Sequence, residues 1–182
     1  MTIERWEIDV GRSGIRFAVR HLALSKTRGK FSRWSGAVMV PDGDLTRAVV
    51  NVVIDASSID TGVPRRDAHL RSEDYLGVER HPHITFTASQ VSAAPDGRLR
   101  VVGALTIKDV TREVTLVAVP NGCTRDSLGH DRARFTARTA IERRDFGFTG
   151  NLALDAGGLV IGERIDIEIE VEAVRRSIAR AA

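Results

Sequence analysis

Apolar and polar residues alternate along most of this chain, and the pattern is cleanest near its C-terminus. The apolar positions there are Ile165, Ile167, Ile169 and Val171, which alternate with Asp166, Glu168, Glu170 and Glu172. A two-residue period places the two sets on opposite faces of a β-strand, so this segment predicts a strand with one dry face and one wet face. The segment 135–141 has the same period, with Phe135, Ala137, Thr139 and Ile141 on the apolar side.

Similar patterns predict about eight or nine strands, most of them joined by short polar turns. The expected strands cover residues 6–8, 15–21, 28–40, 45–55, 84–89, 99–107, 111–119, 135–141 and 165–171. The first of these is expected to be an edge strand, and a loop is expected over 120–130. Turns as short as 41–44 and 95–97 favour antiparallel pairing.

The absence of βαβ spacing leaves an all-β sandwich or barrel. We favour an antiparallel eight-stranded β-barrel, because several strands are long and Gly29 and Gly36 lie inside one of them, where they suit bends and closure. Length and composition, at 182 residues and 42% hydrophobic, predict a single domain over residues 1–182.

One segment, residues 57–82, breaks the alternation. Turn formers precede Pro64, which suits the first turn of a helix, and the pattern predicts a short helix from Pro64 to Arg71. Ser72 is expected to cap a second helical turn that reaches Tyr75, and Pro82 begins the next strand. We interpret the segment as a helical cap on the barrel.

The apolar faces mix large and small side chains, which makes a hollow barrel plausible without deciding against a filled one. The large members are Phe17, Phe31, Phe86 and Phe135, and the small ones are Ala48, Ala88, Ala104, Ala118 and Ala137.

Several motifs together resemble the YceI-like polyisoprenoid-binding family. In the cap they are Ser58-Ile59-Asp60-Thr61-Gly62, Arg66-Asp67-x-His69-Leu70, Asp74-Tyr75-Leu76 and His81-Pro82-x-Ile84-x-Phe86. The other blocks begin at Ser13-Gly14-Ile15, Gly29-Lys30-Phe31, Gly103-x-Leu105-Thr106-Ile107 and Arg143-x-Asp145-Phe146-Gly147, in family order. This chain departs from the family at Tyr75-Leu76-Gly77, where two phenylalanines and an aspartate are usual.

The resemblance implies a lipocalin-like barrel with an apolar tunnel that holds an isoprenoid chain, such as a polyprenyl compound or an isoprenoid quinone, for storage, transport or protection. No catalytic cofactor and no metal are expected. The expected ligand-binding residues are Phe17, Val19, His21, Phe31, Trp34, Leu70, Tyr75, Leu76, Phe86, Phe135, Ala137, Phe146 and Phe148.

Charge and cysteine content narrow the partners further. The chain has 27 basic and 24 acidic residues, and its arginines are scattered among acids. Arg132, Arg134 and Arg138 run beside no exposed aromatic, which does not fit a nucleic-acid surface. The lone Cys123 excludes an intramolecular disulfide. No run approaches the ~20 apolar residues of a membrane span, and residues 1–6 lack the apolar core of a signal peptide, so we expect a cytoplasmic protein. A transient membrane encounter and a homodimer stay open.

Two other readings use the polar residues near the cap. His21, His69, Asp67, Asp145 and Arg66 can supply acid–base groups and an anion clamp for a barrel enzyme that acts on a hydrophobic substrate. Neighbouring arginines can instead pair with these acids. His69, His81 and His83 can serve as metal ligands, although Pro82 and the lack of a fourth ligand argue against that. We expect a binding protein rather than an enzyme.

Overall fold

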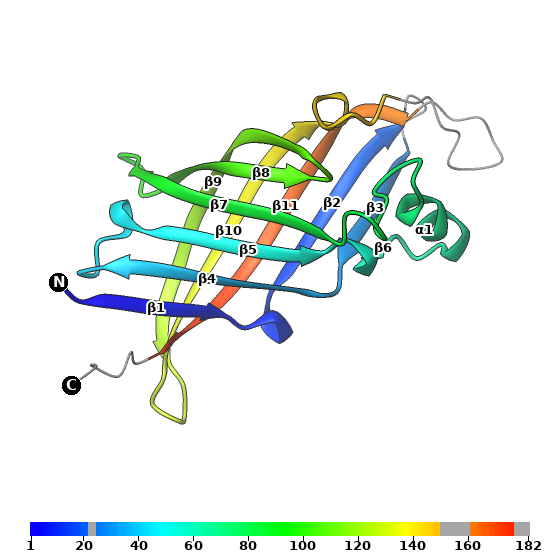
Figure 1. The fold of residues 1–182 in the computed structure, drawn as a ribbon. Helices are drawn as coiled ribbons and strands as arrows, with labels where there is room; N and C mark the ends of the chain where they lie inside the picture. The colour runs from blue at the N-terminus through cyan, green and yellow to red at the C-terminus, as the bar shows by residue number, and fades with distance from the viewer. Residues whose placement is uncertain (22–24, 150–160, 177–182) are drawn as a thin grey trace.

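The computed structural model describes residues 1–21, 25–149 and 161–176, and most of these residues lie in strands (Figure 1). The strands are β1 (Ile3–Ile8), β2 (Gly14–His21), β3 (Lys26–Phe31), β4 (Trp34–Pro41), β5 (Val49–Asp55), β6 (Ile59–Asp60), β7 (His83–Ala93), β8 (Leu99–Ile107), β9 (Val110–Arg125), β10 (Asp131–Glu142) and β11 (Ile161–Arg176). The helical segments are α1 (Pro64–Arg71) and the short 3₁₀ helices η1 (Val10–Arg12), η2 (Leu45–Arg47), η3 (Ala56–Ser58) and η4 (Arg143–Phe146).

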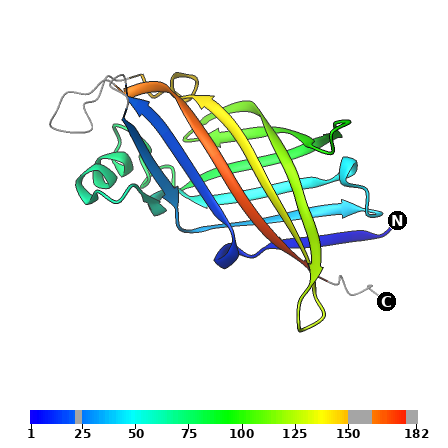
Figure 2. The same cartoon turned by 180° about the vertical axis from the view of Figure 1, so that it is seen from behind.

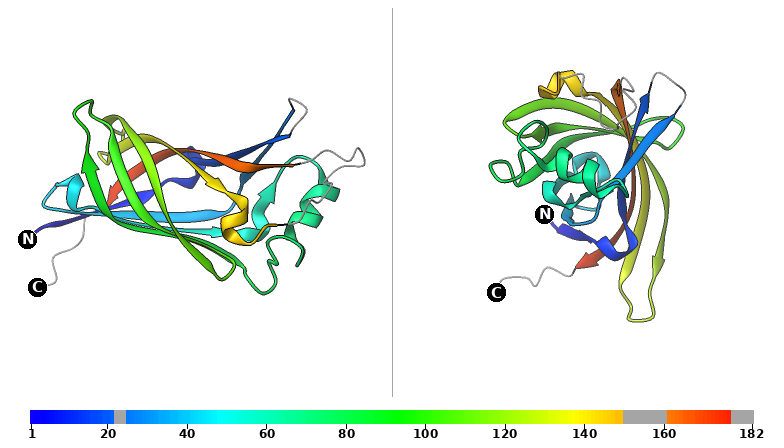
Figure 3. Two further views of the ribbon diagram at one scale, coloured as in Figure 1. Left: turned by 90° about the horizontal axis from the view of Figure 1, so that it is seen from above. Right: turned by 90° about the vertical axis from the view of Figure 1, so that its right-hand side faces the viewer.

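The sheet closes on itself. Its order runs β1-β4-β5-β7-β8-β9-β10-β11, and β11 also pairs with β1, so within the described residues eight strands form an antiparallel ring. The helix α1 lies across one end of this ring, as the end-on view shows (Figure 3). The structure thus confirms the predicted all-β, eight-stranded antiparallel barrel with a short helical cap.

Two further strands extend the barrel toward the cap. β11 pairs with β1 near its C-terminal end, from Ile8↔Ala173 onward, and with β2 over most of the rest, where the two run side by side (Figure 2). On their other edges, β1 pairs with β4 and β2 pairs with β3. The N-terminal segment is therefore not an edge strand, because closure of the barrel gives β1 a partner on each side.

The prediction of one long strand over residues 28–40 is wrong in one respect. The structure has two strands there, β3 and β4, separated by Ser32 and Arg33. The Ser32 amide donates to the Ser58 carbonyl at 3.2 Å, and the Arg33 carbonyl accepts from the Asp55 amide at 3.0 Å. These bonds satisfy backbone groups where the strand turns a corner, so the break leaves them paired. Gly29 does not cause the bend; it provides room for the ring of Phe17 on β2.

The loop expected over residues 120–130 is mostly strand. β9 continues to Arg125, and only residues 126–130 connect it to β10. Pro120 and Gly122 suggest a break, but the pair absorbs them through a register shift between Ala133 and Phe135, with Gly122 at a φ of 98°. A bulge of this kind accommodates a residue that cannot donate to the ladder.

The helix of the cap begins at Pro64 and ends at Arg71, as the sequence predicts. No second helical turn follows: the Ser72 hydroxyl donates backward to the His69 carbonyl at 2.7 Å, and residues 73–76 form turns. The N-capping role expected of Ser72 is therefore wrong, because its hydroxyl bonds to the end of the preceding helix instead of starting another.

The polar face of β11 is not uniformly wet. The Glu172 side chain is only 8% exposed, because Arg132 and Arg134 on β10 contact its carboxylate oxygens at 2.9 and 3.0 Å. Desolvation raises the pKa of this carboxyl. The hydrogen bonds from Arg134 and Arg132 and the nearby arginine charges together lower it by more, so the pKa lies below its usual value. Alternation alone cannot show that a charged side chain is covered by its cross-strand partners.

Candidate ligand-binding cavity

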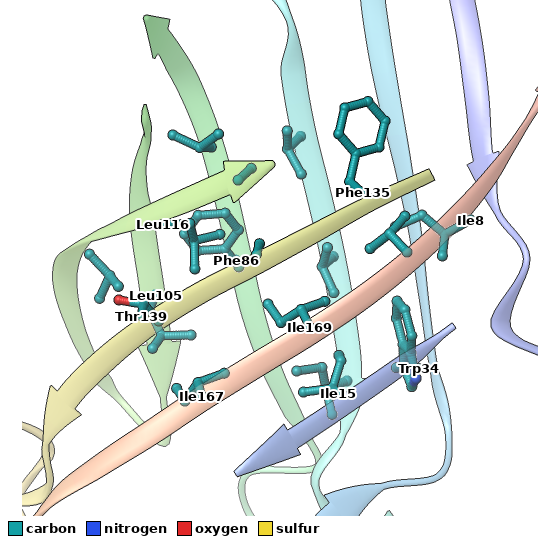
Figure 4. Close-up of a pocket in the computed structure, with 18 of the residues that line it drawn as sticks. Ile8, Ile15, Trp34, Phe86, Leu105, Leu116, Phe135, Thr139, Ile167 and Ile169 are labelled. Atoms are coloured by element: carbon teal, nitrogen blue, oxygen red, sulfur yellow. The ribbon is translucent and has the colours of Figure 1, made fainter. Parts of the chain in front are cut away.

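The barrel encloses a cavity of about 520 Å³ whose wall is almost entirely apolar. This volume falls within the range of about 300–1,000 Å³ that is typical of small-molecule sites. The close-up shows isoleucine, leucine and aromatic side chains that converge from several strands (Figure 4). Such a wall offers dispersion contacts and few polar partners.

Strands β10 and β11 build one side of the cavity. Their inward residues are Phe135, Ala137, Thr139, Ile141, Ile165, Ile167, Ile169 and Val171, all of which line it. Thr139 adds little polarity, because its hydroxyl donates to the Thr115 carbonyl at 2.8 Å. The strict two-residue period of the sequence therefore corresponds to one wall of a hollow.

The small residues do not all face inward. Ala48, Ala118 and Ala137 line the cavity, whereas Ala88 is buried without lining it. Ala104 is exposed on the outer face, contrary to the expectation, because the inward positions of β8 are Val101, Leu105 and Ile107. Successive side chains of a strand point to opposite faces, so Ala104, next to the inward Leu105, faces outward.

The cap closes one end of the cavity with Leu70, Tyr75 and Leu76. The Tyr75 ring meets the edge of His69 at a centroid distance of 5.2 Å, and Phe148 lies 6.2 Å away with the rings 27° apart. Phe148 follows η4, so this contact joins the cap to the segment after β10.

Polar bonds hold the cap in place. Arg71 donates from Nε to the Ser57 carbonyl and from Nη2 to the Ile59 carbonyl, both at 2.7 Å. The buried carboxylate of Asp67 accepts from the Thr61 amide at 3.0 Å and from its hydroxyl at 2.5 Å. These two residues fix α1 to the segment before it, which gives Asp67 a structural role.

The opposite end of the cavity is lined by Glu4, Trp6, Gly43 and Leu45. The indole nitrogen of Trp6 donates to Glu4 Oε2 at 3.1 Å, and Arg175 contacts Glu4 Oε1 at 3.3 Å. The polar atoms at this end are therefore already paired with one another.

Most of the residues that the sequence singled out meet at the cavity wall. They are Phe17, Val19, Phe31, Trp34, Leu70, Tyr75, Leu76, Phe86, Phe135, Ala137 and Phe148. His21 and Phe146 do not line it. His21 Nε2 lies 2.6 Å from Thr27 Oγ1, and Phe146, the last residue of η4, is 2% exposed and packs into the core. Contact of the wall residues with a ligand stays a prediction.

Sequence reasoning overlooked part of the wall, including Ile8, Val38, Leu116 and Arg143. The alternation within β1, β4 and β9 was the signal for the apolar members. Arg143 had no such signal. It is buried, and it donates from Nε to the Gly162 carbonyl at 3.2 Å and from Nη1 to the Phe148 carbonyl.

The polar groups proposed for an enzyme do not converge on the cavity. Neither His21, His69, Asp67, Asp145 nor Arg66 lines it. His69 Nε2 instead contacts Asp74 Oδ2 at 3.4 Å. Over residues 1–21, 25–149 and 161–176, no group of three histidine, cysteine or acidic side chains has an arrangement that suits a metal ion. In the same part of the chain no helix has both the length and the apolar character needed to cross a bilayer.

Comparison with known proteins agrees with this architecture. Residues 6–173 match the model of the YceI-like domain. A UPF0312 protein of Vibrio vulnificus is 32% identical over 166 residues, which is 90% of this chain and 82% of that protein. The crystal structure of the Campylobacter jejuni YceI protein superposes with a TM-score of 0.73 at 26% identity, covering 87% of this chain and 90% of that one.

A polyisoprenoid binding domain from Saccharophagus degradans shares the fold alone, with a TM-score of 0.67 at 16% identity over 94% of this chain and 98% of that one. The family model covers nearly all of the barrel, from within β1 to within β11. On this match, the chain belongs to the YceI-like domain family.

Proposed function

We propose that this protein binds a long isoprenoid chain inside its barrel, for storage, transport or protection of that chain, and that it is not an enzyme. The observation that carries the proposal is the continuous apolar wall of the cavity of about 520 Å³ beneath the cap. The Saccharophagus degradans domain, which has the same fold, is described as polyisoprenoid binding, and this supports the choice of an isoprenoid.

Burial of methylene groups supplies the affinity in this proposal. Each one contributes about 0.8 kcal/mol, so one isoprene unit contributes roughly 3 to 4 kcal/mol before the cost of ordering it. The polar atoms of Thr139 and Trp6 are already paired, so they add little. Affinity should therefore rise with chain length until the cavity is full.

The apolar character of the ligand also determines how it enters and leaves the barrel. A chain of this kind partitions into membranes, so we propose that loading and release occur during transient encounters with a membrane. The acid–base candidates lie off the cavity wall, which favours binding over catalysis.

A chain-length series tests the proposal. Protein freed of bound lipid is titrated with prenyl alcohols of increasing length, and displacement of a fluorescent lipid probe is measured. The expected result is a dissociation constant that falls steeply with each added unit and then levels off. Equal and weak binding of all lengths contradicts the proposal.

A further inference from the structure

Strands β2 and β3 differ in character between their two sides. Phe17, Val19 and Phe31 line the cavity from the inner side. Successive side chains of a strand point to opposite faces, so the residues between these point outward. Every exposed residue of the two strands is basic, and these residues are Arg16, Arg20, Lys26, Arg28 and Lys30.

One part of this outer surface has its charges balanced. Arg16 and Lys30 are direct partners in the β2–β3 pair. Arg16 contacts Glu170 on β11 at 3.1 Å, and Lys30 contacts Asp60 on β6 at 3.8 Å. An acid beside each cation therefore offsets the repulsion between the two cations.

The other part has no such balance. Arg20 and Lys26 are also direct partners, and Arg28 lies two residues farther along β3. Among the described residues, none of these three side chains forms an ion pair. Like charges that face each other across a strand pair destabilise it, so folding gives no reason for this arrangement. We call Arg20, Lys26 and Arg28 the basic face.

The acids of the neighbouring strand do not neutralise the basic face. Glu163 and Asp166 lie on β11, which pairs with β2. Glu163 contacts Arg144 at 2.6 Å, and Asp166 contacts Arg164 at 2.8 Å. Both carboxylates are thus already engaged by other arginines, and the basic face keeps its positive charge.

The location of the basic face connects it with the cavity. This end of the β2–β3 pair lies at the same end of the barrel as α1, whose Leu70 lines the cavity (Figure 1). Arginines at the opposite end are instead paired with acids: Arg47 with Asp42, Arg98 with Asp96, and Arg176 with Glu7. The unbalanced charge therefore lies where the cap closes the cavity.

We propose that the basic face binds the anionic surface of a phospholipid membrane and brings the cap end of the barrel to it. The inference rests on the proposed function and deepens it, because it assigns the surface through which the barrel meets its lipid source. Lysine and arginine side chains near an anionic membrane are attracted to it. Neither strand has an exposed aromatic ring on which a nucleic-acid base can stack, so a membrane fits this face better than a nucleic acid.

The test measures sedimentation of the ligand-free protein with vesicles. Vesicles of phosphatidylcholine are compared with vesicles of equimolar phosphatidylcholine and phosphatidylglycerol. The wild type should bind only the anionic vesicles, and high salt should release it. A variant that combines Arg20→Gln, Lys26→Gln and Arg28→Gln should bind roughly 100-fold more weakly, since each basic residue contributes about fivefold.

A matched control removes the same net charge from the opposite end of the barrel. It combines Arg47→Gln, Arg98→Gln and Arg176→Gln, and it should bind anionic vesicles nearly as tightly as the wild type. Thermal unfolding checks that both variants fold. The basic-face variant should be at least as stable as the wild type, because it loses a repulsion between like charges.

Three results would overturn the inference. The two variants weaken vesicle binding equally, the wild type binds no vesicles, or it binds a single-stranded oligonucleotide more tightly than anionic vesicles. Displacement of a fluorescent lipid probe by a prenyl alcohol, measured without vesicles, tests the proposed function separately. A wild type that binds the prenyl alcohol but no vesicles refutes the docking surface alone. Vesicle binding through the basic face without prenyl binding supports that surface and refutes the proposed function.

Discussion

The ring of Phe17 lies so close to Gly29 on the neighbouring strand that a β-carbon at position 29 would stand 2.3 Å from Phe17 Cζ. The two residues are direct partners in the β2–β3 pair. A glycine without a side chain leaves its backbone open, and the aromatic ring covers it. Since Phe17 also lines the cavity, this contact sets the shape of the wall.

Gly29→Ala should displace that ring. All three nearest atoms belong to the phenyl ring, so the ring must leave its place against the Gly29 backbone to admit a methyl group. We expect a loss of about 1 to 3 kcal/mol in the free energy of unfolding, the usual cost of overpacking. Urea denaturation measures it. Gly14→Ala is the matched control in β2, where the nearest group is the Arg16 guanidinium at 3.6 Å. Equal stabilities for the two variants contradict the packing described here.

Ala137→Trp distinguishes a hollow barrel from a filled one. Ala137 lines the cavity, so the indole should enter space that a ligand would occupy. We expect lipid binding to be lost while the thermal transition of the ligand-free protein stays close to wild type. In a packed core the same change would cost about 1 to 3 kcal/mol. Arg138→Trp, one residue on and facing outward, should affect neither property strongly.

Leu70→Asp tests the role of the cap. Leu70 lines the cavity from α1, and a carboxylate there would face an apolar chain without a partner, which is costly. We expect retention of a bound lipid to fall about tenfold or more, equivalent to at least ~1.4 kcal/mol, while circular dichroism shows an intact barrel. Ala68→Asp places the same charge on the exposed side of the helix and should retain lipid normally. Normal retention by Leu70→Asp would reduce the cap to a surface connection.

Acid should destabilise the protein through the β9–β10 connection. Asp126 accepts bonds from the amide of His130, from Arg132 Nε and from the amide of Leu128, all at 2.9 Å, and these lower its pKa to about 2. A lowered folded-state pKa gives stability that is complete above the unfolded value near 4 and is lost as the pH falls toward 2.

Urea denaturation at a series of pH values checks this effect. Asp126→Asn keeps an oxygen that can accept the amide bonds but removes the carboxylate, so its stability should fall less between pH ~4 and ~2 than that of the wild type. Asp109→Asn, at an exposed turn, serves as the control and should follow the wild-type curve. An unchanged slope in Asp126→Asn would show that this carboxylate does not couple folding to protons.

The barrel was accessible from the sequence because each inner face repeats at two residues. Ile165, Ile167 and Ile169 face the cavity as their alternation predicts, and Pro64 marks the true start of α1. The corner at Ser32 was not accessible, because distant backbone groups at Ser58 and Asp55 stabilise it. Alternation shows which side chains share a face but not where a strand leaves the sheet.

The cavity wall was predicted better than its polar details. The chosen aromatics lie on the wall because large apolar residues at strand positions have few other places to go. His21 lies elsewhere, since Thr27 on the adjacent strand contacts its ring. The burial of Arg143 was not accessible from the sequence, because it goes with bonds to the Gly162 and Phe148 carbonyls that no local pattern encodes.

The most direct test of the central claim is mass spectrometry of an organic extract from the intact protein purified out of cells. The account predicts a long apolar molecule with an isoprenoid chain, in near-stoichiometric amount and absent from the Ala137→Trp protein purified in parallel. Extracts that repeatedly contain nothing above background, from protein that also fails to exchange a fluorescent lipid probe for a quinone or prenyl chain, would contradict it.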